Sequence, residues 1–104
     1  MKLQQLRFIL AISESDLNIT LASQRLYTSQ PGVSKQLRLL EEELGMEIFC
    51  RNGKSLVGIT DEGRVVLEKA RAIMDTVNEI KEFSNEVNGY HRPVSLSQFA
   101  SMGR

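Results

Sequence analysis

The chain is short of the residues from which disulfides, metal centres and membrane spans are built. Its 104 residues include one cysteine, Cys50, and one histidine, His91, which excludes an internal disulfide and leaves too few Cys and His ligands for a zinc site. No apolar run approaches the roughly 18–20 residues of a membrane span. The opening stretch, interrupted by Gln4, Gln5 and Arg7, does not resemble a signal peptide. We therefore expect a cytoplasmic protein with no metal, no cofactor and no membrane partner.

The chain also lacks an excess of charge of either sign, because Lys and Arg total 13 and Asp and Glu total 13. Many nucleic-acid-binding domains are basic, so this neutrality argues mildly against one, although a neutral protein can carry a basic patch. Ser, His and acidic residues form no nucleophile motif. We therefore do not expect an enzyme. The length and the 41% apolar content are ordinary for one soluble domain with one core.

Residues 29–44, SQPGVSKQLRLLEEEL, contain the most informative pattern. Four apolar residues follow the spacing of a buried helical stripe: Val33, Leu37, Leu40 and Leu44. Ser29 is a good N-cap, because its hydroxyl can accept a bond from the backbone N–H of Gly32, and Pro31 suits the first turn. The polar residues near the helix start are Gln30, Ser34, Lys35 and Arg38. Such a helix suits base edges and phosphates, as a DNA-recognition helix must.

Two shorter helices are expected before it. Residues about 2–14 present a wide apolar surface, made by Leu3, Leu6, Phe8, Ile9, Leu10 and Ile12. Asn18 is a plausible N-cap for a second helix over about 19–26, whose inward residues are Ile19, Ala22 and Leu26. Tyr27 and Thr28 then form a turn. Two helices separated by a short turn, the second with a polar start, are typical of a helix-turn-helix.

A small β-hairpin is expected next. Gly45 ends the recognition helix, since glycine accepts the left-handed conformation. The apolar stretches 47–51 and 56–59 flank Asn52-Gly53, which is a strong hairpin-turn dipeptide. This pattern predicts a wing with Arg51 and Lys54 near its tip. We interpret Cys50 beside Phe49 as a small buried filler rather than a redox sensor.

The last regular element is predicted to be a long helix. Thr60 caps it, with acidic residues in the first turn that suit the helix dipole, and Asn88 and Gly89 end it. Its apolar seam consists of Val66, Ala70, Ile73, Val77, Ile80 and Val87. A seam of this kind indicates a partner helix, most simply that of a second copy, or packing on the first helix of the same chain. The remaining large apolar residues Met46, Met74 and Phe83 are expected in the core.

Residues 26–63, LYTSQPGVSKQLRLLEEELGMEIFCRNGKSLVGITDEG, closely resemble the N-terminal domain of LysR-type transcriptional regulators. The resemblance covers about residues 1–88 and implies a mainly α fold, in which a winged helix-turn-helix precedes a linker helix that dimerises. The MKLQQLR, LYTSQPG, SKQ and R-x-G-K segments look particularly like the CysB branch, which regulates sulfur assimilation and cysteine biosynthesis. Family members are much longer and carry a C-terminal α/β effector domain, so a small-molecule effector would act only through a domain missing here.

The resemblance also implies roles for individual residues. Those implied to face bases in the major groove are Gln30, Pro31, Ser34 and Lys35. Those implied to hold or approach phosphates are Thr28, Ser29, Gln36 and Arg38. From the wing, Arg51 and Lys54 would reach the DNA backbone or the minor groove.

The sequence thus predicts three segments: a winged helix-turn-helix over 1–60, a linker and dimerisation helix over 61–88, and a tail, or the start of a missing effector domain, over 89–104. The predicted function is sequence-specific binding of double-stranded DNA by a homodimer or tetramer. The alternative is a protein-interaction module whose helix-turn-helix has no DNA affinity of its own, which the neutral net charge favours slightly.

Overall fold

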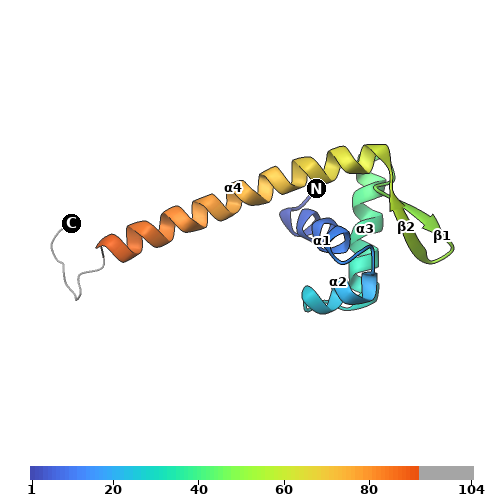
Figure 1. The fold of residues 1–104 in the computed structure, drawn as a ribbon, viewed down its shortest axis with the longest axis horizontal. Helices are drawn as coiled ribbons and strands as arrows, with labels where there is room; N and C mark the ends of the chain where they lie inside the picture. Colours follow the sequence, from blue (N-terminus) through green and yellow to red (C-terminus); the bar gives the residue numbers. More distant parts are fainter. Residues whose placement is uncertain (92–104) are drawn as a thin grey trace. The chain divides into compact units, whose positions relative to one another are not determined.

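The computed structural model describes residues 1–91. In chain order the elements are α1 (Leu3–Glu14), α2 (Ile19–Arg25), α3 (Gln30–Leu44), β1 (Phe49–Asn52), β2 (Ser55–Ile59) and α4 (Asp61–His91) (Figure 1). The chain divides into two units, Met1–Met74 and Asp75–Arg104. Four helices and a two-stranded antiparallel hairpin confirm the predicted mainly α, winged helix-turn-helix fold. The expected tail beyond residue 91 lies outside the described residues.

Short polar side chains fix the helix starts as predicted. The Asn18 Oδ1 accepts a bond from the Leu21 N–H at 3.0 Å, and the Ser29 Oγ accepts one from the Gly32 N–H at 3.1 Å. Each bond satisfies one of the backbone donors that a helix start leaves free. At the other end of α3, Gly45 adopts the left-handed conformation with φ +69°, which a glycine adopts without steric cost.

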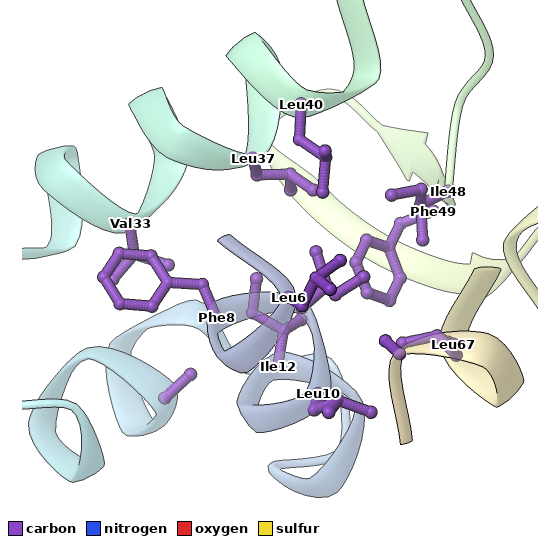
Figure 2. Close-up of a cluster of buried hydrophobic side chains, with 13 residues drawn as sticks. Leu6, Phe8, Leu10, Ile12, Val33, Leu37, Leu40, Ile48, Phe49 and Leu67 are labelled. Atoms are coloured by element: carbon purple, nitrogen blue, oxygen red, sulfur yellow. The ribbon is translucent and has the colours of Figure 1, made fainter. Parts of the chain in front are cut away.

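One cluster of apolar side chains from α1, α2, α3, the start of the hairpin and the first three turns of α4 forms the core of the first unit (Figure 2). Val33, Leu37 and Leu40 are fully or almost fully buried, as predicted. Leu44 and Met74 are partly buried against the same cluster. Two predictions of burial are wrong, because Met46 and Phe83 are exposed. Leu3, part of the apolar surface of α1, is exposed as well. An apolar residue at the margin of a helical stripe need not meet the core, and isolated exposed apolar residues are normal.

The hairpin turn lies one residue further along than predicted. Asn52 pairs with Ser55, so the two connecting residues are Gly53 and Lys54, and Gly53 takes the positive φ of +65°. A two-residue loop with glycine first is one of the favoured hairpin connections, and it displaces Asn52 into the strand. The shift places Lys54 in the turn itself, at the tip of the wing.

Helix α4 starts where the sequence predicts and ends later. The Thr60 Oγ accepts a bond from the Gly63 N–H at 2.8 Å, which caps the helix. Within the first unit, Leu67 and Ala70 are buried in the core cluster. The predicted stop at Asn88 and Gly89 is wrong, since the helix continues to His91. A single glycine lowers helix stability by only about 1 kcal/mol relative to alanine, which does not end a long helix.

Gly63 is the residue whose replacement should damage the first unit most directly. A Cβ at this position would overlap the carbonyl oxygen of Ile48, a residue buried at the base of the wing. We expect Gly63→Ala to lower the free energy of unfolding by about 2–3 kcal/mol, as overpacked cores do, in urea denaturation. The matched control is Gly89→Ala, where a Cβ meets nothing within 4 Å. Equal stability of the two variants would contradict this close approach of α4 to the wing.

Candidate nucleic-acid interface

The start of α3 presents a polar face to solvent. Because Val33 and Leu37 are buried, the residues between them on the helix turn outward. Five of the predicted DNA-binding residues are exposed on this helix: Gln30, Pro31, Ser34, Lys35 and Arg38. A helix held by its opposite face is a rigid support for such side chains, and its width fits the major groove of B-DNA.

Three other predicted contact residues already bond within the protein. The Thr28 hydroxyl donates to the Leu26 carbonyl at 3.0 Å, while the Ser29 hydroxyl caps α3. The Gln36 Oε1 accepts from the side-chain amide of the buried Gln5 on α1 at 3.1 Å. These bonds hold the start and the middle of α3 in place. The Gln36 contact depends on α1, and sequence reasoning missed it.

A groove of about 540 Å³ lies between α3 and the wing. Four predicted DNA-binding residues line it: Ser34, Arg38, Arg51 and Lys54. The structure therefore brings together side chains from two segments that the sequence separates by more than a dozen residues. The groove also has acidic lining residues, Glu41, Glu42 and Glu47.

The charges of α3 are divided along its length. Lys35 and Arg38 lie within its first nine residues, whereas Glu42 and Glu43 are exposed near its end. The Arg38 Nε lies 3.6 Å from the Glu42 carboxylate, and both side chains are more than half exposed, so this pair adds little stability. A phosphate backbone is attracted to these two cations and repelled by the acidic end of the helix.

Arg51 and Glu41 form an ion pair between the wing and α3. The Arg51 Nη2 donates to the Glu41 Oε1 at 2.7 Å, and the Glu41 side chain is only 9% exposed. Its Oε2 accepts from the backbone N–H groups of Ile48 and Phe49, at 2.7 and 3.4 Å. Glu41 therefore differs from Glu42 and Glu43, which are exposed at the same end of the helix. Its position four residues after Leu37, on the buried side of the helix, was the available signal.

The residues of the predicted dimer seam fall into three groups. Ala70 is 1% exposed, and Val66 packs partly buried against the same core cluster, so both contribute to the core of their own chain. Ile73 is 38% exposed. In the second unit, Val77 and Val87 are half-buried and Ile80 is 64% exposed. Phe83, three residues after Ile80 on the same helix, is 67% exposed. The seam thus includes apolar side chains that the described chain does not bury.

Other kinds of site find no support in residues 1–91. No helix in that range is long and apolar enough to cross a membrane. No three His, Cys, Asp or Glu side chains of the described residues gather where they could hold a metal ion. Cys50 is a half-buried free thiol.

A helix-turn-helix with an exposed polar recognition helix, followed by a hairpin, defines the winged helix-turn-helix class of DNA-binding domains. Residues 3–64 match the model of the family described as bacterial regulatory helix-turn-helix protein, lysR family. The chain belongs to this family.

Two relatives and one solved structure illustrate the similarity. The chain is 47% identical over 93 residues to the HTH-type transcriptional regulator CysB of Haemophilus influenzae, covering 89% of this chain and 28% of the relative. It is 42% identical over 93 residues to the regulator cbl of Klebsiella aerogenes, covering 86% and 29%. The CbnR DNA-binding domain in complex with DNA superposes with a TM-score of 0.73 at 30% identity, covering 84% of this chain and 98% of that one. The chain thus spans less than a third of the length of these curated relatives.

The Ser29 cap predicts a measurable stability effect. Ser29→Ala removes the acceptor for the Gly32 N–H and should lower the free energy of unfolding by about 1 kcal/mol, measured in urea. The matched control is Asn18→Ala, which removes the equivalent cap of α2 and should cost a similar amount. Unchanged stability of Ser29→Ala beside a destabilised Asn18→Ala would contradict the assigned start of α3.

Proposed function

We propose that this chain is the sequence-specific, double-stranded DNA-binding domain of a LysR-type transcription regulator and acts as a homodimer. The observation that carries this proposal is that exposed cations from two elements line one groove: Arg38, beside Ser34, on α3, and Lys54 on the wing. The family match and the DNA-bound relative support the same assignment.

The roles proposed for individual residues are those that the family resemblance implies. Gln30 and Lys35 lie near the start of α3 and would face base edges in the major groove, with Pro31 and Ser34 beside them. Glutamine can bond adenine through two bonds and lysine can bond guanine, each good pair discriminating by about 1–3 kcal/mol. Around this set, Thr28, Ser29, Gln36 and Arg38 would contact or approach phosphates. Lys54 would reach the DNA backbone or the minor groove from the wing tip. Arg51 lies in β1, further from the tip than Lys54.

The proposal of a dimer is supported by apolar side chains that the described residues do not bury. Ile73, Ile80 and Phe83 are exposed, and exposed apolar side chains at helical spacing favour a partner helix. Two copies would place their recognition helices in successive major grooves, about 34–36 Å apart for half-sites one turn apart. A tetramer would join two such dimers.

The regulated genes are proposed from the relatives. The similarity to CysB and cbl supports control of sulfur assimilation and cysteine biosynthesis, exercised in the cytoplasm. A small-molecule effector would act through a part of the protein outside these residues. No enzymatic activity is proposed, since the similar proteins are transcriptional regulators.

Replacing Lys35 and Lys54 one at a time should distinguish base recognition from phosphate binding. Lys35→Ala should lose discrimination between the preferred duplex and random DNA, because it removes a base contact. Lys54→Ala should weaken binding to all sequences and reduce the slope of log K against log salt by about 0.9, the value for one phosphate contact. Fluorescence anisotropy at several salt concentrations, on a duplex selected from a random pool and on random duplex, measures both.

Equal loss of affinity for both duplexes in Lys35→Ala would contradict the base-reading role. If the parent protein binds no duplex even at low salt, the chain is instead the protein-interaction module that its neutral charge slightly favours.

The dimer has its own test. Ile80→Glu should convert the protein to monomers in light scattering, since it buries an unpaired charge in the proposed helix–helix contact. The control Glu79→Gln changes an exposed neighbour and should remain dimeric. A dimer that persists in Ile80→Glu at micromolar concentration would contradict this interface.

A further inference from the structure

We propose that Glu41 is a positioning residue of the DNA interface: its buried carboxylate fixes the wing against α3, so that Lys54 meets DNA while Arg51 serves the wing rather than the phosphates. This inference rests on the proposed function. It assigns a role to a residue for which the family resemblance implied none.

Burying the Glu41 carboxylate has a cost in free energy. The Glu41 side chain is 9% exposed, and a buried charge is tolerated only where several polar partners replace water. Three donors converge on it: the Arg51 guanidinium at 2.7 Å, the Ile48 N–H at 2.7 Å and the Phe49 N–H at 3.4 Å. All three belong to the segment that enters and forms β1.

These bonds connect α3 to the wing. Glu41 follows Leu37 and Leu40 on the buried side of α3, and α3 is the recognition helix. Ile48 and Phe49 are fully buried at the base of the hairpin, whereas Arg51 lies further along β1 toward the turn. The carboxylate therefore holds the hairpin at its base, through Ile48 and Phe49, and again at Arg51 nearer the turn. The direction of the wing relative to α3 depends on these bonds.

The two cations of the wing, Arg51 and Lys54, differ in whether they are free to contact DNA. The Arg51 guanidinium is bonded to Glu41 and also donates to the Phe49 carbonyl at 3.5 Å. Lys54, in the turn, is exposed and lines the groove. If Arg51 moved away from Glu41 to contact a phosphate, the buried Glu41 carboxylate would lose its ion-pair partner, which is energetically costly. Within residues 49–59, Lys54 is thus the cation that no acidic side chain holds.

The decisive experiment measures whether Glu41→Gln raises or lowers the affinity for DNA. Removing an acidic group near DNA ordinarily raises affinity, because the phosphates are repelled less. The positioning role predicts the opposite for Glu41→Gln: a loss of about three- to tenfold in affinity at physiological salt, comparable to losing one phosphate contact. The matched control is Glu43→Gln, an exposed acid on the same helix whose partner is the N-terminal ammonium. It should bind at least as tightly as the parent protein.

A double variant shows whether Glu41 acts through Lys54. If it does, Glu41→Gln combined with Lys54→Gln should bind no more weakly than Lys54→Gln alone, whereas independent sites would add their losses. Affinity of Glu41→Gln equal to or above that of the parent, or additive losses, would overturn the proposal. Thermal melts of each variant establish that it is folded at the temperature of the binding assay.

Arg51→Gln provides a second route if Glu41→Gln does not fold, because it leaves the two backbone bonds of Glu41 intact. The proposal predicts that adding Arg51→Gln to Lys54→Gln leaves the salt slope unchanged, while a direct Arg51–phosphate contact would lower it by about a further 0.9. A further drop would overturn the assignment.

Hydrogen exchange distinguishes failure of the proposed DNA-binding function from failure of the role proposed for Glu41. If the parent protein binds no duplex, hydrogen exchange of the hairpin amides still tests the role of Glu41 in holding the wing. Exchange in β1 and β2 should accelerate in Glu41→Gln and not in Glu43→Gln. Equal protection in the two variants would overturn the inference on structural grounds.

Discussion

The burial of one side of α3 against α1 is the constraint on which the rest of this structure depends. Val33 and Leu37 of α3 enter the same cluster as Phe8 and Ile12 of α1 (Figure 2). Because successive residues of a helix are rotated by a fixed angle, fixing this side also fixes the outward direction of Ser34 and Lys35. A recognition helix can present the same side chains to every DNA molecule only if it cannot roll about its own axis, and the core prevents that rotation.

The wing is attached to this helix by a different kind of force. Its base is apolar, through Ile48 and Phe49, but the bonds that reach α3 are polar and end on Glu41. Hydrogen bonds depend on direction more strongly than apolar contacts do. A carboxylate that accepts bonds from three donors can therefore fix the orientation of a short hairpin. Removing one partner is energetically costly because the charge stays buried. The groove between α3 and the wing owes its shape to both kinds of contact.

Features that depend on neighbouring residues were predictable from the sequence. The caps at Asn18 and Ser29, the left-handed Gly45 and the stripe of α3 each involve residues within a few positions, and all were predicted correctly. Features that depend on contacts between distant segments were not. The Gln5–Gln36 bond joins residues 31 positions apart, and the Glu41–Arg51 pair requires the hairpin to fold back onto α3. The turn at Gly53 and Lys54 depends on strand register, which a dipeptide alone does not determine. The direct DNA contacts remain predictions.

The most direct test of base reading by α3 is a search for intermolecular nuclear Overhauser effects in a complex of the isotope-labelled protein with an unlabelled duplex selected from a random pool. The account predicts effects from the side chains of Gln30, Ser34 and Lys35 to base protons in the major groove. Effects from these side chains to sugar protons alone, or effects only from residues outside α3 and the wing, would contradict it.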